Sequence, residues 1–266
     1  MVKLVCFDVD NTLLKREETH ISSDVIHMMR NLMSKGVLVA VTSGRPLCDL
    51  IRLFSDVLSD IIIVSYDGSL AVYKNNIIIS RPIQKDLLFS FIDTVKNGGV
   101  LEYAAYGAGC VYVNSDFSKN AVSSMEKAGT MEKRVVHISD FYKIDEPIFK
   151  MSVYIKPSEA NMTHDYEYFI SDWENYLKNI YTGNGWCEFI MSGTDKGSAV
   201  EVLCEKFSVN RDEVMAFGDG INDVSMLSFA GFSFAVNTEI SEVRSAAKYE
   251  TEDVLHTVNG FFGIEK

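Results

Sequence analysis

The stretch VCFDVDNTLL, residues 5–14, decides the fold, because an apolar run of strand length ends there in two aspartates. The residues from 2 to 9 are almost continuously apolar, as in a strand that is buried on both faces of a sheet. Asp8 and Asp10 fall close to the end of this strand. Because a buried carboxylate is costly unless a partner compensates it, two of them together indicate a functional site.

Strands and helices alternate along the residues that follow. Apolar residues recur with helical spacing over 21–35, where Ser22 or Ser23 is expected to cap the helix. Apolar strands follow at 37–44 and 60–68, and Pro46 stands early in the helix between them. This alternation, with strands that are almost wholly apolar, is typical of parallel βαβ units.

The C-terminal part of the chain repeats the same alternation. We expect its elements to complete one parallel sheet with the N-terminal ones. The predicted elements are a helix at 196–207, a strand at 214–220, a helix at 222–230, a strand at 231–236 and a helix at 239–247.

The middle of the chain has a different pattern, with more aromatic residues and more alternation in its strands. We predict strands here at 100–107, 110–114, 149–156 and 178–184, and helices at 84–97, 118–128 and 158–171. The predicted fold class is therefore α/β, a Rossmann-like three-layer core with a parallel central sheet and an inserted α+β domain. The core comprises 1–81 and 188–266, the insert comprises 82–187, and both connections are expected to be hinges.

Composition narrows the class of protein. The chain has 266 residues, of which 47% are hydrophobic and 23% charged, as in ordinary globular proteins. Its net charge of −12 disfavours binding to nucleic acid and to anionic membranes. The five cysteines are scattered, which argues against a zinc site or a disulfide framework. We expect a cytoplasmic protein without a membrane span, either a monomer or a homodimer.

Polar residues gather where the predicted parallel strands end, and ligands bind at that edge of an open sheet. The second strand leads into Thr42 and Ser43, and the strand at 214–220 leads into GDGIND at 218–223. That motif supplies Asp219, Asn222 and Asp223. Together with Asp8, Asp10 and Lys196, which opens the helix at 196–207, these side chains should share one crevice.

Four carboxylates in one crevice would raise each other's pKa values steeply. A Mg²⁺ ion bound by Asp8, Asp10, Asp219 and Asp223 would resolve this conflict, since it prefers oxygen ligands. The site could then accept a phosphate, and the ion would help to orient and polarise it.

The remaining polar groups form a seat for that phosphate. Lys196 and the Ser43 hydroxyl can contact phosphoryl oxygens, and the backbone amides from Gly44 into the next helix add donors. Asp8 can act as a nucleophile that forms an aspartyl-phosphate. Asp10 is placed to shuttle protons to the leaving group and from water.

Each motif also has a simpler structural interpretation when it is taken alone. Two aspartates at a strand end can form a turn, and Gly-Asp-Gly is common in turns. Asn222 or Asp223 can cap a helix, and Lys196 can be an ordinary solvated lysine. The combination of all of them at strand ends and helix starts favours a shared catalytic site.

DVDNT at 8–12, VTSGRP at 41–46, DKG at 195–197 and GDGIND at 218–223 resemble the four motifs of the haloacid dehalogenase (HAD) superfamily. Chain length and the position of the insert are similar to those of Cof-type sugar-phosphate phosphatases, which carry a C2B cap. The resemblance implies that Asp8 is a nucleophile and a Mg²⁺ ligand, and that Asp10 is the general acid/base. The Asp10 main-chain carbonyl and Asp219 would ligate the metal directly, and Asp223 would support it through water. Ser43, Lys196 and Asn222 would lie at the phosphate.

Two residues depart from the family pattern. Asn11 stands where the first motif usually has glycine, and asparagine is the non-glycine residue best suited to left-handed backbone. Asp67, in YDGSL at 66–70, stands where these phosphatases often have the asparagine of an NGA motif. We weigh two roles for Asp67, a turn residue, which we favour, and a ligand for a substrate hydroxyl.

The resemblance implies a Mg²⁺-dependent phosphatase that hydrolyses small phosphorylated metabolites, most naturally sugar phosphates. Two alternatives stay open, a sugar phosphomutase and a non-catalytic phosphosugar-binding protein. Specificity is expected in the insert. Tyr103 and Tyr106 either contact the ligand or cover the sheet of the insert, and Asn184 and Trp186 either reach the ligand or form a hinge turn.

Overall fold

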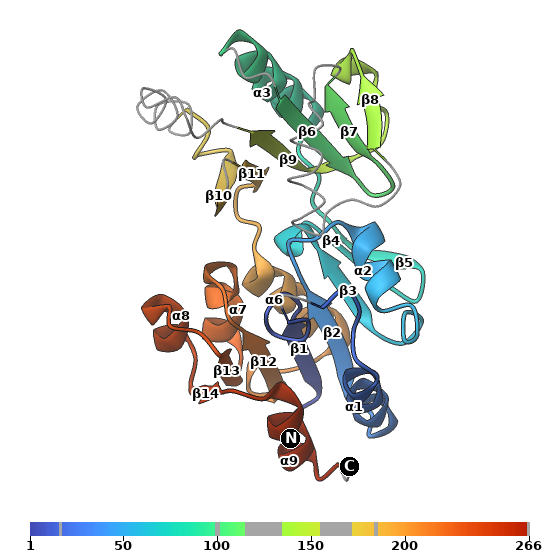
Figure 1. Ribbon diagram of the computed structural model, residues 1–266, viewed down its shortest axis with the longest axis vertical. Coiled ribbons are helices and arrows are strands. Elements are labelled where there is room, and N and C mark those ends of the chain that lie inside the picture. Colours follow the sequence, from blue (N-terminus) through green and yellow to red (C-terminus); the bar gives the residue numbers. More distant parts are fainter. Residues whose placement is uncertain (16–17, 99–101, 115–134, 155–171, 184–185, 265–266) are drawn as a thin grey trace. The chain divides into compact units, whose positions relative to one another are not determined.

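The computed structural model divides the chain into two compact units, which are described separately below (Figure 1). The residues it describes are 1–15, 18–98, 102–114, 135–154, 172–183 and 186–264. The first unit comprises Met1–Gly44, Leu50–Ser80 and Asp195–Lys266. The second unit comprises Arg45–Asp49 and Arg81–Thr194.

The first unit is built on an eight-stranded sheet in the order β14-β13-β12-β1-β2-β3-β4-β5. Strand β1 (Leu4–Asp8) lies between β2 (Leu38–Thr42) and β12 (Val214–Gly218), parallel to both. The N-terminal and C-terminal parts of the chain therefore meet at β1, as the alternation of strands and helices predicts. The other strands are β3 (Ile62–Ser65), β4 (Leu70–Tyr73), β5 (Asn76–Ser80), β13 (Phe232–Val236) and β14 (Tyr249–Thr251).

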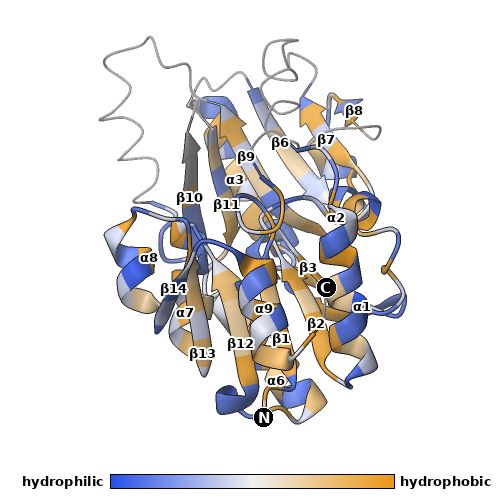
Figure 2. Ribbon diagram, turned by 60° about the horizontal axis from the view of Figure 1, so that its bottom comes forward, coloured by the Kyte–Doolittle hydropathy of each residue, from blue (hydrophilic) through white to orange (hydrophobic). Residues whose placement is uncertain are grey.

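Helices cover both faces of this sheet. On one face, Leu4 and Cys6 of β1 pack in a buried cluster with Leu203 of α6 and Leu227 of α7. On the opposite face, α1 packs against β2 and α9 (Figure 2). The result is the predicted three-layer α/β core. The helices are α1 (Ser23–Ser34), α2 (Leu47–Leu53), α6 (Lys196–Phe207), α7 (Val224–Phe229), α8 (Ser241–Ala246) and α9 (Val254–Phe262).

Four aromatic rings lie side by side across neighbouring parallel strands. Phe7, Phe217, Phe234 and Tyr249 occupy matching positions on β1, β12, β13 and β14. Successive ring centroids are 5.3, 4.9 and 5.1 Å apart, and each pair is stacked. Because aromatic cross-strand pairs favour one register over others, this row contributes to the alignment of the ends of β1 and β12.

The third predicted strand is shorter than expected, and a hairpin follows it. Strand β3 ends at Ser65, and the chain then turns through Tyr66, Asp67 and Gly68, whose φ angles are +51°, +50° and +103°. Strands β4 and β5 pair antiparallel and extend the sheet. The expected strand at 60–68 is therefore wrong in its last residues, because three left-handed residues in a row end it.

The second unit contains a six-stranded sheet in the order β10-β11-β9-β6-β7-β8. All neighbouring strands are antiparallel except β7 and β8, and helix α3 (Lys85–Asn97) packs on the sheet through Phe91 and Ile92. The strands are β6 (Glu102–Gly107), β7 (Val111–Asn114), β8 (Val135–Ile138), β9 (Ile148–Tyr154), β10 (Leu177–Gly183) and β11 (Trp186–Met191). The helices predicted at 118–128 and 158–171 lie outside the described residues.

Both tryptophans of the chain belong to the second unit. Trp173 packs edge-on against Phe91 at 5.2 Å, and Trp186 packs against Tyr154 at 5.0 Å. Because β11 pairs with both β10 and β9 through Phe189, this unit runs to Thr194 and not only to 187. Asn184, which we named with Trp186 as a candidate ligand contact, lies outside the described residues.

None of the helices that the structure describes combines the length and the apolar character that crossing a membrane requires.

Candidate active site

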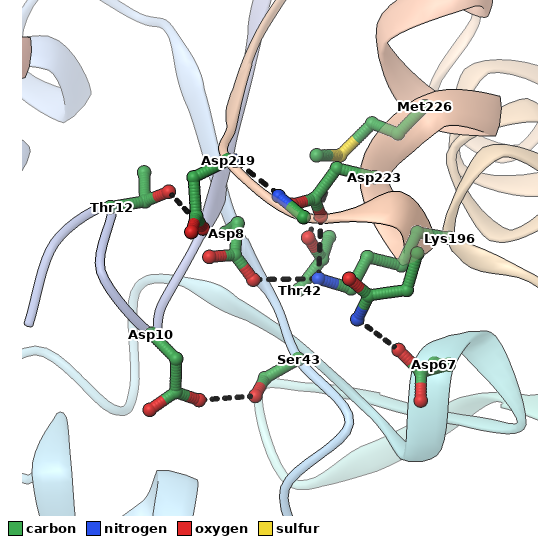
Figure 3. A network of polar contacts seen from close by, with 12 residues as sticks. Asp8, Asp10, Thr12, Thr42, Ser43, Asp67, Lys196, Asp219, Asp223 and Met226 are labelled. Carbon is green, nitrogen blue, oxygen red and sulfur yellow. Dashed lines mark hydrogen bonds and ion pairs between the residues drawn. The ribbon is translucent and has the colours of Figure 1, made fainter. Parts of the chain in front are cut away.

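Polar side chains meet at the carboxyl edge of the parallel strands of the first unit (Figure 3). Asp8 is the last residue of β1, and Ser43 comes directly after β2. Asp219 comes directly after β12, and Lys196 is the first residue of α6. The structure therefore brings together the four motifs that are dispersed along the sequence.

Lys196 joins two of the predicted metal ligands. Its Nζ donates to Asp8 Oδ1 and to Asp223 Oδ1, in both cases at 2.6 Å. All three side chains are buried, with 0% of Lys196, 4% of Asp8 and 1% of Asp223 exposed. The interpretation of Lys196 as a solvated lysine is therefore wrong.

Burial and charge determine the protonation of this group. Burial raises the pKa of Asp8 well above its ordinary value, and so does the nearby Asp223 carboxylate, whereas Lys196 lowers it. Burial alone would lower the pKa of Lys196, but Asp223 and Asp8 raise it above its ordinary value. The two carboxylates therefore favour the charged form of Lys196, which lies between them.

Asp219 is held by the turn that follows β1. Asn11 Nδ2 donates to Asp219 Oδ2 at 3.2 Å, and Thr12 Oγ1 donates to Asp219 Oδ1 at 3.3 Å. Asn11 has a φ of +59°, which is the left-handed conformation expected for the residue that replaces glycine. Burial and the nearby Asp223 raise the pKa of Asp219, although both donors oppose this shift.

The carboxylates fit a hard cation. Asp8, Asp219 and Asp223 each offer an oxygen, and these oxygens lie within 4.8 Å of one another. Among the residues that the structure describes, Asp8 Oδ2 is buried and has no hydrogen-bond partner. A buried carboxylate oxygen without a partner is costly, so it indicates a ligand at this point. Oxygen donors of this kind suit Mg²⁺.

The turn of GDGIND shapes this acidic group. Asp223 Oδ2 accepts hydrogen bonds from the backbone N–H groups of Asp219 at 3.1 Å and Gly220 at 3.0 Å. A Cβ at Gly218 would overlap the side chain of Asp223, so only glycine lets that carboxylate fold back beneath the turn. The glycine and the second aspartate of the motif are thus structurally linked.

Asp10, the predicted general acid/base, and Ser43, a predicted phosphate contact, lie beside this group. Ser43 Oγ donates to Asp10 Oδ2 at 3.5 Å, and the Ser43 N–H donates to Val64 O at 3.0 Å. Ser43 is buried, whereas Asp10 is only half-buried. A partly accessible carboxylate can exchange protons with a ligand, which is the role predicted for Asp10.

Asp67 has a closer link to the site than a turn residue needs. Its Oδ1 accepts a hydrogen bond from Asn222 Nδ2 at 2.8 Å, and its side chain is only 3% exposed. It also occupies the left-handed turn, so its preferred interpretation as a turn residue is confirmed but incomplete. The alternative role, contact with a substrate hydroxyl, stays a hypothesis.

Sequence reasoning missed two residues that support the site. Thr12 holds Asp219, and Ser225 Oγ accepts the N–H of Gly197, next to Lys196, at 3.0 Å. Thr12 stands two residues after Asp10 in the first motif, which is a usable signal in the sequence. The sequence gives no signal for Ser225, because only the close approach of α6 and α7 brings it to Gly197.

Comparison with known proteins identifies the family of this chain. Residues 5–258 match the family of haloacid dehalogenase-like hydrolases. The chain is 25% identical over 253 residues to the Escherichia coli 5-amino-6-(5-phospho-D-ribitylamino)uracil phosphatase YbjI, covering 93% of this chain and 90% of that protein.

Solved structures share the fold of this chain. A crystal structure from Eubacterium rectale matches with a TM-score of 0.88 and 25% identity over 98% of this chain and 99% of that one. The HAD subclass IIB sugar phosphatase BT4131 matches with a TM-score of 0.80 and 19% identity, over 99% of this chain and 100% of that one. The family match spans both sheets and includes all four motifs, which meet at the acidic group of Asp8, Asp219 and Asp223. The chain therefore belongs to the haloacid dehalogenase-like hydrolases, and it is a phosphatase.

Proposed function

We propose that this phosphatase is a Mg²⁺-dependent phosphomonoesterase that works through an aspartyl-phosphate on Asp8. The observation that carries the proposal is the state of the Asp8 carboxylate. One oxygen is held by Lys196 at 2.6 Å, and the other is buried without a partner among the described residues. A pinned carboxylate with one free oxygen is suited both to a metal ion and to attack on phosphorus.

The metal would be held by Asp8, Asp219 and Asp223, with the Asp10 main-chain carbonyl as a further ligand. When it is bound, Mg²⁺ would neutralise the acidic group and polarise the phosphoryl oxygens. Lys196 and Ser43 would hold the phosphoryl group, with the amides near Gly44 and the carboxamide of Asn222 as further donors. These groups place charge and hydrogen bonds where the transferred phosphoryl group carries its negative charge.

Two displacement steps at phosphorus complete the reaction. In the first, an Asp8 oxygen bonds to phosphorus, the ester P–O bond breaks, and Asp10 gives its proton to the leaving oxygen. In the second, Asp10 takes a proton from water as the water oxygen bonds to phosphorus. The bond between Asp8 and phosphorus then breaks, and inorganic phosphate leaves.

Relatives suggest the class of substrate. The name of YbjI specifies a phosphorylated ribityl compound, and BT4131 is described as a sugar phosphatase. We extend this class, phosphate esters of sugars or of related polyols, to the present chain. We also propose that the second unit is the cap domain that selects the substrate. The cytoplasmic location and the monomeric or homodimeric state stay predictions.

Exchange of Asp8 for asparagine tests the proposed nucleophile. Asp8→Asn should lower Mg²⁺-dependent release of phosphate from p-nitrophenyl phosphate by about a thousandfold or more, because an amide is a poor nucleophile. The control is Asp24→Asn, which changes an exposed aspartate in the first turn of α1 and should retain full activity. Circular dichroism would establish that both variants are folded.

Full activity of Asp8→Asn would contradict the assignment of Asp8 as the nucleophile. A screen of sugar and polyol phosphates, with analysis of the sugar product, would separate the alternatives. Phosphate release without an isomerised sugar excludes a phosphomutase. Tight binding of sugar phosphates without any turnover would instead favour a binding protein.

A further inference from the structure

Asp67 is a buried carboxylate that the proposed mechanism does not use. It lies outside the acidic group of Asp8, Asp219 and Asp223, yet it contacts Asn222, which follows that group's Asp219 in the same turn. Asp67 interacts electrostatically with Lys196 at the centre of the site, where it contributes, after Asp223 and Asp8, to the raised pKa of Lys196. A buried negative charge near a seat for anions opposes anion binding. A carboxylate at this point therefore calls for a role that offsets this cost.

The backbone around Asp67 is held in an uncommon conformation. Tyr66 and Asp67 both have left-handed φ angles, which cost free energy in residues other than glycine. The Asp67 N–H donates to Ser43 O at 3.0 Å, and Gly68 lies so close to the Asp195 carbonyl that a Cβ there would overlap it. The turn is therefore fixed to the loops that carry Ser43 and Lys196.

The side chain of Asp67 is fixed as firmly as its backbone. A Cβ at Gly44 would lie 2.8 Å from Asp67 Oδ2, so the absence of a side chain at Gly44 makes room for this carboxylate. On its other side, Oδ1 accepts from Asn222 Nδ2. Asp67 consequently bridges the loop after β2 and the loop after β12, the two loops that form the predicted phosphate seat.

The chemistry of this bridge sets the orientation of Asn222. An ionised carboxylate only accepts hydrogen bonds, so Asn222 must turn its NH₂ group, and not its carbonyl oxygen, toward Asp67. The amide nitrogen carries two hydrogens, and Asp67 accepts a hydrogen bond from one of them. An asparagine at position 67 could donate or accept, and it would therefore allow either orientation of the Asn222 carboxamide.

We infer that Asp67 is a positioning residue, which holds Asn222 so that its second N–H is available to a phosphoryl oxygen. This inference rests on the proposed function, in which Asn222 lies at the phosphate. It assigns two opposing effects to Asp67. Positioning of Asn222 strengthens phosphate binding, whereas the negative charge of Asp67 weakens it, and these two effects can be separated by removing Asn222.

A double-mutant cycle separates them, since coupling between two residues appears as non-additivity. The variants are Asp67→Asn, Asn222→Ala and their combination, and the measurements are the inhibition constant of inorganic phosphate, KM and kcat with p-nitrophenyl phosphate. In the native background, Asp67→Asn should weaken phosphate inhibition and raise KM by about tenfold, with a smaller change in kcat. In the Asn222→Ala background, the same exchange should leave phosphate inhibition unchanged or strengthen it.

Equal weakening by Asp67→Asn in both backgrounds would overturn the inference, as would tighter phosphate inhibition in the native background. A native protein that neither hydrolyses the ester nor responds to phosphate would refute the proposed function, and the inference with it. An active native enzyme with an additive cycle would refute only the inference.

A second experiment tests the inference if Asp67→Asn alone folds poorly. It exchanges the side chains of Asp67 and Asn222 with each other. Asn222→Asp sets two carboxylates against each other and should lower the melting temperature. Adding Asp67→Asn restores a donor and an acceptor in reversed order, so the melting temperature should recover. Phosphate inhibition should not recover, because position 222 no longer carries an N–H. Recovery of both properties would contradict the positioning role.

Discussion

Lys196 shows how a single residue depends on its three-dimensional surroundings. In the sequence it is one lysine at the start of a helix, where a solvated position is the ordinary expectation. In the structure it is fully buried and joins Asp8 and Asp223, residues far away along the chain. The combined motifs predicted that Lys196 shares a crevice with these aspartates, but its full burial and its two ion pairs follow only from the meeting of β1, α6 and the loop after β12.

The glycines at 68 and 36 allow a prediction at the residue scale. Both have positive φ angles, +103° and +78°, but a Cβ at Gly68 would overlap the Asp195 carbonyl, whereas a Cβ at Gly36 would meet nothing within 4 Å. Gly36→Ala should lower the free energy of unfolding by about 1 kcal/mol, from backbone strain alone. Gly68→Ala should lower it by about 3 kcal/mol, because overlap adds to the strain. Urea denaturation of both variants provides the comparison, and equal losses would contradict this account.

At the scale of the elements, hydrophobic patterning predicted the parallel strands and therefore the edge at which the site forms. Asp8, Ser43 and Asp219 could be placed together because each follows an apolar strand of one sheet. Ser22 accepts the N–H of Val25 and caps α1, as predicted. Patterns of this kind are local, and they work where a strand is buried on both faces.

The hairpin of β4 and β5 was missed for a physical reason. Its turn contains Lys74 and Asn75, with φ angles of +50° and +62°. Lysine is not a residue that marks left-handed backbone, and no glycine stands in this turn. Likewise, no sequence rule places an aromatic residue such as Tyr66 at positive φ. The turn at Tyr66 is tied to the loop after β2, because the Asp67 N–H donates to Ser43 O, and a local sequence pattern does not contain this contact.

The N-cap of α6 gives a prediction at the element scale. Asp195 accepts the N–H of Ser198 at 2.7 Å, and Ser198 Oγ accepts the N–H of Asp195 at 3.0 Å. Asp195→Ala should lower the free energy of unfolding by about 1 kcal/mol. Since the next residue is Lys196, the Asp195→Ala substitution should also lower kcat/KM severalfold by loosening the start of the helix.

The matched control is Ser22→Ala, which removes the N-cap of α1 and should cost a similar amount of stability. Because α1 supplies none of the candidate site residues, kcat/KM should not change. Two outcomes would show that the cap of α6 does not position Lys196. One is a loss of activity in Ser22→Ala, and the other is unchanged activity in a folded Asp195→Ala. Thermal melts and steady-state kinetics on both variants are sufficient.

At the scale of the whole molecule, the acidic group links stability to pH and to metal. The pKa values of Asp8 and Asp219 are raised in the folded protein, so the folded protein keeps protons that the unfolded chain releases. The contribution of these protonated groups to stability is complete below the ordinary aspartate pKa and is lost as the pH rises through the raised values. A cation that binds the ionised carboxylates should restore stability at the higher pH.

We therefore expect Mg²⁺ to raise the melting temperature of the metal-free protein more at about pH 8 than at about pH 5, where bound protons compete with the metal. Thermal melts with and without Mg²⁺ after treatment with a chelator measure this difference, and sodium chloride of equal ionic strength is the control. An equal rise in melting temperature at both pH values would indicate that the ion binds elsewhere.

The position of Trp173 and Trp186 has a practical consequence for studies of folding. Because both indole rings lie within the second unit, selective excitation of tryptophan reports on that unit alone. Circular dichroism, in contrast, averages over the backbone of the entire chain. If the emission spectrum and the dichroism signal change at different denaturant concentrations, the two units unfold as separate cooperative blocks. If the two curves coincide, they unfold as one.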